Sequence, residues 1–284
     1  LNADIYEKAL KGKEFGIVYK DLQLDFSRVK ARKDKMVKKL SMGVDFLMKK
    51  NRIETFRGKG RLLTPETVQV EGDETREIRA RKIIIATGSE STMFPGLEPD
   101  GTTILTSKEI LDLENVPQSL LIIGGGAIGV EFASIFARFG SNVTLVEMLP
   151  RLLPVEDQEI SEEIRKLLAK QRIKILVNAK LEDLRAQEGS AHATVLDDQG
   201  KVHEIIAEKA LVAVGRKPVT EGLGLEKLRI ETSRSFITID ANMQTSVPGI
   251  YAIGDVVPTQ ALAHLASHEG ILAAGEVGLT TSSR

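Results

Sequence analysis

Cysteine is absent from the 284 residues of this chain. This absence excludes disulfide bonds, thiolate metal sites and thiol catalysis within the chain, and it fits a reducing compartment. Long apolar runs are also missing, since none approaches the roughly 18 residues that a membrane-spanning helix needs. No signal-peptide pattern opens the sequence, so we expect a cytoplasmic protein, with the mitochondrial matrix as the alternative.

A charge imbalance is missing as well. The chain has 39 Lys and Arg residues against 40 Asp and Glu residues, which gives a formal net charge of −1. We therefore expect neither a nucleic acid nor a membrane as a partner. Hydrophobic residues make up 42% of the chain, and its length is sufficient for two ordinary domains, each with its own core.

The most informative segment is an apolar run that ends in a Gly-x-Gly-x-x-Gly pattern. Gly124 permits the tight turn, Gly126 lets the backbone approach a pyrophosphate, and Gly129 lets the following helix pack closely on the strand. The free amides and the positive end of that helix would then face the phosphates. The predicted phosphate site consists of Gly124, Gly126, Ala127, Ile128 and Gly129.

A second strand and an acidic residue strengthen this interpretation. A helix over 127–139 should stop at Gly140, and residues 142–146 are typical of a buried parallel strand. Glu147 ends this strand, near the offset at which an acid accepts hydrogen bonds from the adenosine ribose. A carboxylate at this place favours NAD over NADP, because a 2′-phosphate would meet a like charge. The alternative is that Glu147 is only a solvated strand end.

A repeated pattern indicates two related units. Residues 67–70 and 77–88 are typical of a β-meander that ends in a buried strand and an Ala-x-Gly sequence. Residues 193–196 and 203–215 repeat this order. Chance similarity of two meanders is the alternative interpretation.

Only the second of these repeats, which ends at Gly215, has its glycine loop in the sequence. Gly124 lies 91 positions before Gly215, and the same offset from Gly88 falls before residue 1. We therefore expect the first repeat, which ends at Gly88, to lack its opening strand, its phosphate loop and its first helix.

The predicted fold is α/β, with two Rossmann-like domains that carry β-meanders. Residues 1–116 and 240–284 would form an incomplete Rossmann-like domain, and residues 117–239 would form an inserted NAD-binding domain. Turn-rich residues 95–101 and the mixed segment 219–234 would act as the linkers.

Residues 28–52 form a basic segment, with ten Lys and Arg residues against two Asp residues. A role in binding RNA or lipid, or in targeting, is one interpretation. We favour a solvated helix whose apolar stripe packs on a domain. The stripe consists of Val29, Met36, Val37, Leu40, Val44, Leu47 and Met48.

His264 and His268 are spaced so that they could share one face of a helix. No third ligand is evident, so we expect no metal site.

Several segments resemble the flavin-dependent disulfide reductases, the pyridine nucleotide-disulfide oxidoreductase family, and they occur in the order found there. These segments are 83–89, 124–131, 214–218 and 249–255. Residues 147–154 and 262–270 narrow the resemblance to the dihydrolipoyl dehydrogenases. The resemblance spans almost the whole chain and matches the central part of such a protein.

The resemblance implies NAD and FAD as cofactors. The glycine loop would hold the NAD pyrophosphate, Glu147 the adenosine ribose, and Gly215 would border the nucleotide. Glu131 would lie beside the nicotinamide and the flavin ring, which makes it the implied hydride-transfer residue.

The resemblance also implies that the incomplete domain formed by residues 1–116 and 240–284 is FAD-binding-like, and it implies further residues for FAD. Asp255 would accept a hydrogen bond from the ribityl chain, and the turn at Thr87 and Gly88 would line the site. The helix that begins near Leu262 and Ala263 would direct its N-terminus at the electron-rich edge of the flavin.

The implied reaction converts dihydrolipoamide and NAD to lipoamide and NADH through a disulfide and FAD. Lipoamide or a lipoyl domain would be the substrate, and the family is homodimeric. This sequence contains no cysteine, and we expect it to lack the redox cysteine pair of the family, the lysine that would pair with Glu131, and the C-terminal dimer domain.

Two alternatives remain open from the sequence. One is a non-catalytic NAD(H)-binding module, and the other is the core of a related NADH oxidase or coenzyme-A disulfide reductase. Glu147 argues against the NADPH-using glutathione and mercuric reductases.

Overall fold

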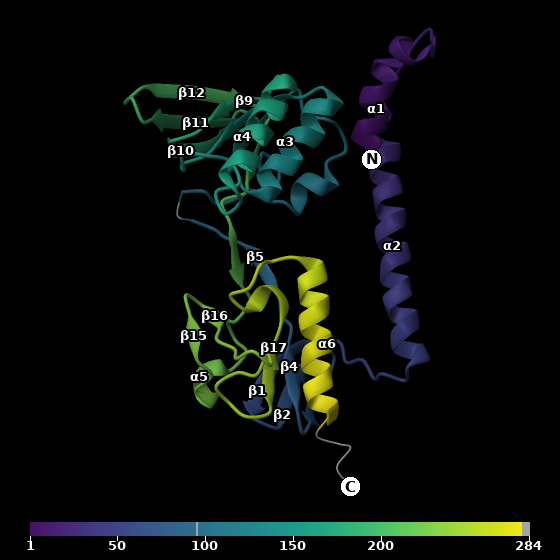
Figure 1. Cartoon of the computed structure of the whole chain (residues 1–284), viewed down its shortest axis with the longest axis vertical. Coiled ribbons are helices and arrows are strands. Elements are labelled where there is room, and N and C mark those ends of the chain that lie inside the picture. Colours follow the sequence, from purple (N-terminus) through teal and green to yellow (C-terminus); the bar gives the residue numbers. More distant parts are fainter. Residues whose placement is uncertain (95, 280–284) are drawn as a thin grey trace. The chain divides into compact units, whose positions relative to one another are not determined.

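The computed structural model describes residues 1–94 and 96–279 (Figure 1). It divides into two compact units, which are described separately. Unit 1 comprises Leu1–Val44 and Ser91–Gly215, and unit 2 comprises Asp45–Glu90 and Arg216–Arg284.

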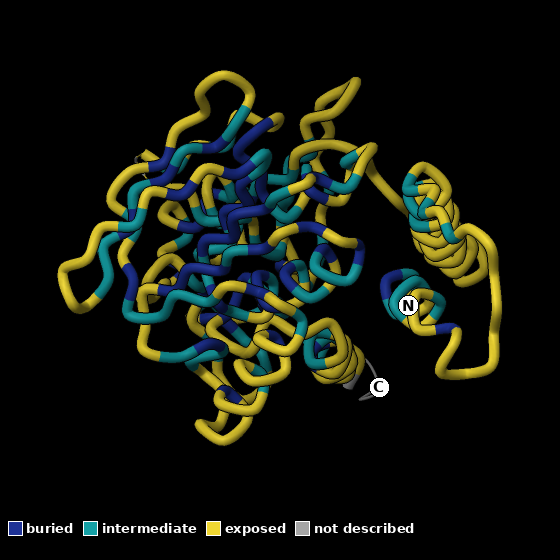
Figure 2. Tube along the Cα trace, turned by 90° about the horizontal axis from the view of Figure 1, so that it is seen from above, coloured by how far each residue is buried: buried dark blue, intermediate teal, exposed yellow. Residues whose placement is uncertain are grey.

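A five-stranded parallel sheet forms the centre of unit 1, with the strand order β6-β13-β7-β8-β9. Its strands are β6 (Ile104–Leu105), β7 (Ser119–Ile123), β8 (Asn142–Val146), β9 (Lys174–Leu176) and β13 (Lys209–Val212). Their near-continuous apolar sequences suit a sheet that is buried on both faces. Figure 2 colours buried residues dark blue, and most residues of β6, β7, β8 and β13 belong to that class.

Helices α3 (Ala127–Phe139) and α4 (Gln158–Lys170) follow β7 and β8. The predicted helix over 127–139 and the predicted strand over 142–146 are confirmed. Gly140 ends α3 with a φ of 103°, a left-handed conformation that glycine adopts without a steric penalty.

The meander of unit 1 consists of β10 (Ala179–Gln187), β11 (Ser190–Asp197) and β12 (Val202–Ala207), all antiparallel. Its buried side chains, such as Leu184 and Val195, belong to one core cluster with Leu121 and Ala210 of the parallel sheet. The meander therefore covers one side of that sheet.

Asp100 organises the connection that leads into β6 and into η2 (Glu109–Asp112). Burial opposes ionisation of Asp100, but bonds from the backbone N–H groups of Thr102, Thr103 and Ile104 hold the pKa of Asp100 below its ordinary value. The stabilisation from these bonds is present above the ordinary pKa and is lost as the pH falls through the folded-state pKa.

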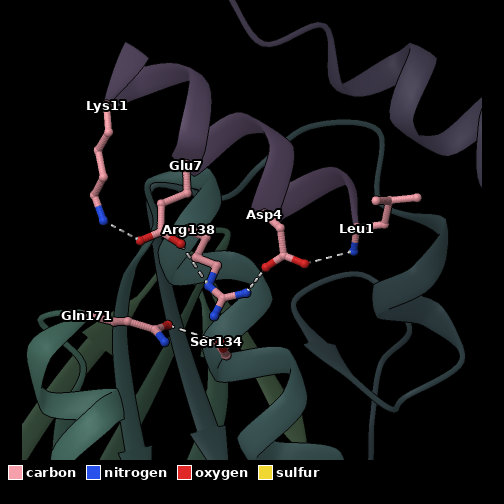
Figure 3. A network of polar contacts seen from close by, with 7 residues as sticks. All are labelled: Leu1, Asp4, Glu7, Lys11, Ser134, Arg138 and Gln171. Carbon is pink, nitrogen blue, oxygen red and sulfur yellow. Dashed lines mark hydrogen bonds and ion pairs between the residues drawn. The ribbon is translucent and has the colours of Figure 1, made fainter. Parts of the chain in front are cut away.

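Residues before α2 pack on α3 through Arg138, as Figure 3 shows for α1 (Asn2–Leu10). Arg138 forms ion pairs with Asp4 and, at 3.2 Å, with Glu7. The segment continues through η1 (Gly12–Phe15) to Phe26, the first residue of the next helix, whose ring meets that of Phe139 edge-on at 5.5 Å.

Helix α2 (Phe26–Lys50) has no buried residue. Lys30 and Lys33 near its start pair with Glu114 and Asp112 at 3.3 and 3.0 Å. The prediction that its apolar stripe packs on a domain is wrong for most of the stripe, because no described residue buries it. Met36, Val37, Leu40, Val44 and Leu47 are 44–68% exposed.

Unit 2 contains a second meander, β1 (Lys59–Thr64), β2 (Thr67–Glu71) and β3 (Thr75–Arg79), and a parallel pair, β4 (Ile83–Ile85) with β17 (Ile250–Ala252). Its other elements are β5 (Ser89–Ser91), whose last residue is assigned to unit 1, β14 (Arg216–Pro218), α5 (Leu225–Leu228), β15 (Thr232–Ser233), β16 (Phe236–Ile237), η3 (Gly254–Val256) and α6 (Ala263–Leu279). Its core includes Leu62, Ile85, Leu225, Ile237 and Ile250. The repeated meanders and the α/β fold class are thus confirmed.

The boundaries of the units differ from the predicted domains. Strand β6 adds to the sheet of unit 1, so residues 91–116 belong there, and residues 1–44 also belong to unit 1. Residues 216–239 belong to unit 2, because α5 and β16 bury their apolar side chains in its core. The sequence predicts linkers at turn-rich segments, whereas the units separate where the apolar side chains change from one hydrophobic core to the other.

Ile122 in the middle of β7 tests this core. It is fully buried, so Ile122→Ala should reduce the free energy of unfolding of unit 1 by about 2–5 kcal/mol. Ile160→Ala on α4 is the control, because that side chain is 54% exposed. Denaturant unfolding, monitored through amide hydrogen exchange in β7 and β8, measures the free energy of unfolding of both variants. Equal losses of stability in the two variants would contradict the assigned core.

Candidate functional site

The glycine loop between β7 and α3 is built by close backbone approaches. Gly124 has a φ of 110°, and a Cβ atom there would lie 2.3 Å from the carbonyl oxygen of Ala213. A Cβ atom on Gly129 would lie 1.9 Å from the carbonyl oxygen of Gly124. Both positions therefore need glycine for steric reasons, in agreement with the turn and packing roles predicted for them.

Gly126 is different, because a Cβ atom there would meet no atom of the described residues within 4 Å. It is the N-cap of α3, and no side chain among those residues caps the helix. The amides of Gly126, Ala127 and Ile128 likewise have no hydrogen-bond acceptor there. Unpaired amides at a helix N-terminus beside open space can hold an anion.

Glu147 is 9% exposed at the end of β8. Its Oε2 accepts the N–H of Gly125 at 2.6 Å, and its Oε1 accepts the N–H of Leu149 at 2.7 Å. A carboxylate has about four acceptor positions, so about two stay available for ligand hydroxyl groups. Glu147 is therefore no freely solvated strand end, which was the alternative interpretation.

Gly125 was not predicted as a site residue, although it lies inside the glycine pattern. A Cβ atom there would lie 2.6 Å from Leu152 and 3.0 Å from the Cβ atom of Glu147. Its carbonyl oxygen accepts the N–H of Leu153 at 2.8 Å. Gly125 thus joins the loop to Glu147 and to the chain that follows β8. The only signal for this role in the sequence is the run of three consecutive glycines, 124–126.

A cavity of about 540 Å³ lies between the residues after β8 and α4. Its lining includes Leu149, Arg151, Leu152, Gln158 and Arg165, and none of the predicted site residues. Leu149 connects it to the acid, because its N–H donates to Glu147.

Glu131 and Gly215 are both exposed in unit 1. Glu131 lies in the first half of α3 and has no partner side chain among the described residues. Gly215 has a φ of 132°, and its carbonyl oxygen accepts the N–H of Thr92 at 3.0 Å. Their roles beside a nucleotide stay predictions.

In unit 2, Thr87 and Gly88 form a turn after β4. The hydroxyl of Thr87 donates to the carbonyl oxygen of Val219 at 2.7 Å, and the carbonyl oxygen of Gly88 accepts the N–H of Val219 at 2.9 Å. Gly88 has a φ of 70°, which favours glycine. The turn is therefore fixed to the chain that follows β14.

Asp255 lies in η3 and is part of a polar cluster with Ser89 and Arg216. Its Oδ2 accepts the hydroxyl of Ser89 at 2.6 Å and lies 3.7 Å from Nε of Arg216. Arg216 also donates to the hydroxyl and the carbonyl oxygen of Ser89, at 2.7 and 2.6 Å. The Oδ1 of Asp255 has no partner in the part of the chain that the structure describes. Sequence reasoning missed Ser89 and Arg216 as site residues, although both lie in the segments that carry the family resemblance.

Leu262 and Ala263 lie at the start of α6, where the prediction places the beginning of a helix. Leu262 is 42% exposed. Within residues 1–94 and 96–279, no group of three or more potential ligands could hold a metal ion. No helix in these ranges is long and apolar enough to span a bilayer.

Residues 5–270 match the family pattern described as pyridine nucleotide-disulphide oxidoreductase. A dihydrolipoyl dehydrogenase of Bacillus subtilis is 42% identical over 283 residues, which cover 96% of this chain and 60% of that protein. A dihydrolipoamide dehydrogenase of Chaetomium thermophilum is 41% identical, with 95% of this chain and 55% of that protein covered. The chain therefore spans about 60% or less of the length of these relatives.

Solved structures of similar proteins agree. The HOCl-induced flavoprotein disulfide reductase RclA from Escherichia coli is 30% identical, with a TM-score of 0.75 over 89% of this chain and 57% of that one. LpdA from Mycobacterium tuberculosis has the same fold, with a TM-score of 0.88 at 24% identity over 97% of this chain and 60% of that one. By its sequence match and its fold, the chain belongs to the pyridine nucleotide-disulphide oxidoreductase family.

Proposed function

We propose that this chain is the NAD-binding core of an oxidoreductase of the dihydrolipoyl dehydrogenase type. One observation carries the proposal: the N-terminus of α3 is uncapped and faces open space at Gly126. A helix end of this kind, at the end of a parallel strand and with an acid on the next strand, is suited to a dinucleotide.

The residues present fit NAD. The amides of Gly126, Ala127 and Ile128 would bind the pyrophosphate, and the remaining acceptor positions of Glu147 would bind the adenosine ribose. When bound, NAD supplies a nicotinamide ring that accepts or donates a hydride. Glu131 and Gly215 would border that end of the nucleotide, and the exposure of Glu131 leaves it accessible for this role.

The described residues would supply only part of a flavin site. Asp255 has a free Oδ1 that would accept a hydrogen bond from the ribityl chain, and Thr87, Gly88, Leu262 and Ala263 would line the site. The described residues contain no second glycine loop that could hold the FAD pyrophosphate. We therefore infer that the 284-residue chain alone binds FAD weakly, and we derive no reaction step through the flavin.

The relatives named dihydrolipoyl dehydrogenase support a substrate class for the whole protein. We propose that it oxidises dihydrolipoamide, free or on a lipoyl domain, with NAD as the acceptor, and that it acts as a homodimer in the cytoplasm. The alternative is that the whole protein is an NADH oxidase or a coenzyme-A disulfide reductase. Measuring turnover of the whole protein with dihydrolipoamide, oxygen and coenzyme-A disulfide would decide between these activities.

Substitutions at two glycines of the loop distinguish an effect on NAD binding from an effect on folding. Gly126→Ala should keep the stability of the parent, within about 0.5 kcal/mol, because the added methyl group meets no atom. It should nevertheless weaken NAD binding by about tenfold or more, because the methyl group would occupy the place proposed for the pyrophosphate.

Gly129→Ala is the matched variant. Its methyl group would overlap the carbonyl oxygen of Gly124, so it should destabilise unit 1 by about 1–3 kcal/mol or more. Thermal unfolding and calorimetric NAD titration measure both variants. Unchanged NAD affinity in the stable Gly126→Ala protein would place the pyrophosphate elsewhere.

Glu147 should determine the choice of nucleotide. A charge-assisted hydrogen bond contributes roughly 1.5–3 kcal/mol, so Glu147→Ala should weaken NAD binding by about 10- to 150-fold. Glu147→Gln keeps an acceptor but loses the charge, so it should raise the affinity for NADP relative to NAD. The ratio of the two affinities is not changed by a general loss of stability. Equal affinity of the parent chain for NAD and NADP would remove Glu147 from the proposed role.

The thiol half of the reaction should be missing from the 284-residue polypeptide. Oxidation of dihydrolipoamide in this family needs a cysteine pair, and the sequence has no cysteine. We expect this polypeptide to purify colourless and to show no reduction of NAD by dihydrolipoamide. Turnover by protein of verified mass, or stoichiometric yellow flavin, would contradict this expectation.

A further inference from the structure

Glu269 is a buried carboxyl group in α6 to which neither the sequence nor the proposed function gives a role. Its residue is 5% exposed. Its Oε2 accepts the N–H of Gly254 at 2.7 Å, whereas its buried Oε1 has no hydrogen-bond partner among the described residues. No cation of those residues pairs with it. A buried polar atom without a partner is unfavourable, so its presence calls for a specific explanation.

The bond to Gly254 fixes the point at which strand β17 turns into η3. The N–H of Ile253 still bonds across the sheet to the carbonyl oxygen of Ile85, and the N–H of Val257 closes the turn on the carbonyl oxygen of Gly254. Gly254 lies between these two bonds with a φ of 71°. Glu269 provides the acceptor for its N–H, so the carboxylate sets the orientation of this peptide unit.

Asp255 is the next residue, and its place depends on that orientation. Its side chain is 29% exposed and reaches Ser89 through Oδ2, with Oδ1 left over. A rotation of the peptide before Gly254 would move the Asp255 carboxylate away from Ser89 and would redirect Oδ1.

We propose that Glu269 is a positioning residue that holds the Gly254–Val256 turn so that Asp255 presents Oδ1 to a ribityl hydroxyl group of the flavin. Glu269 does not touch the ligand and acts only through Asp255. The inference rests on the proposed role of Asp255 in flavin binding, and its test is designed to separate the two.

The first measurement uses the 284-residue chain and needs no flavin. Glu269→Ala removes the acceptor, so the amide of Gly254 should exchange with solvent about tenfold faster or more in NMR-detected hydrogen exchange. Glu269→Gln keeps a carbonyl oxygen that can accept the same bond, so it should restore most of the protection. His268→Gln is the control, because that neighbour on α6 is exposed. Unchanged exchange at Gly254 in Glu269→Ala would overturn the proposal.

The second measurement uses the longest protein that the gene encodes, stripped of flavin and titrated with FAD. Asp255→Ala and Glu269→Ala should each weaken FAD binding by about tenfold, and Glu269→Gln should bind nearly as the parent does. The double variant should bind no more weakly than Asp255→Ala alone, because both substitutions remove the same contact.

The outcomes distinguish the two claims. Unchanged FAD affinity in Asp255→Ala would contradict the proposed flavin contact itself. A loss in Asp255→Ala combined with no loss in Glu269→Ala, or with fully additive losses in the double variant, would show that Glu269 does not act through Asp255.

Discussion

The contact between the first turn of α3 and the loop that precedes it is the constraint on which the nucleotide-binding part of this molecule depends. The helix starts so close to the loop that a single methyl group on Gly129 would overlap the carbonyl oxygen of Gly124. This approach brings the helix N-terminus to the end of β7, and Glu147 holds the loop from the neighbouring strand through the N–H of Gly125. The amides that remain unpaired are therefore presented by a loop that is fixed from both sides, which reduces the ordering needed when an anion binds.

Each unit contains a three-stranded meander that is followed by a parallel strand. The two parallel strands differ in the number of neighbouring strands with which they pair. In unit 1, β13 has a parallel neighbour on each edge, and Leu211 in its centre is fully buried. In unit 2, the corresponding strand β4 pairs with β17 alone among the described strands, and Ile84 in its centre is 37% exposed. The difference in burial follows from the number of neighbours, since a central strand of a parallel sheet is covered on both faces and both edges.

Local signals in the sequence predicted the elements around the loop well, whereas features set by tertiary packing were missed. The limits of α3 follow from the glycine loop before it and Gly140 after it, and the strand over 142–146 follows from its apolar run. The limits of the units could not be predicted, because turn residues at 95–101 and 219–234 do not show to which core the flanking side chains belong. The stripe of α2 has helical periodicity, but periodicity does not reveal whether another element covers it. Glu147 and Glu269 accept hydrogen bonds from the N–H groups of Gly125 and Gly254 outside regular helix and strand pairing, so hydrophobic periodicity does not predict these bonds.

The central claim, that a dinucleotide binds at the N-terminus of α3, can be tested most directly by NMR. The chain labelled with ¹⁵N would be titrated with NAD while the amide signals of Gly126, Ala127 and Ile128 are followed. Our account predicts that these signals shift and saturate together, because unpaired amides gain a phosphate acceptor. It also predicts that the amide of Gly125 shifts less, since it is already bonded to Glu147. Saturable binding that leaves all three amides unshifted would contradict the account.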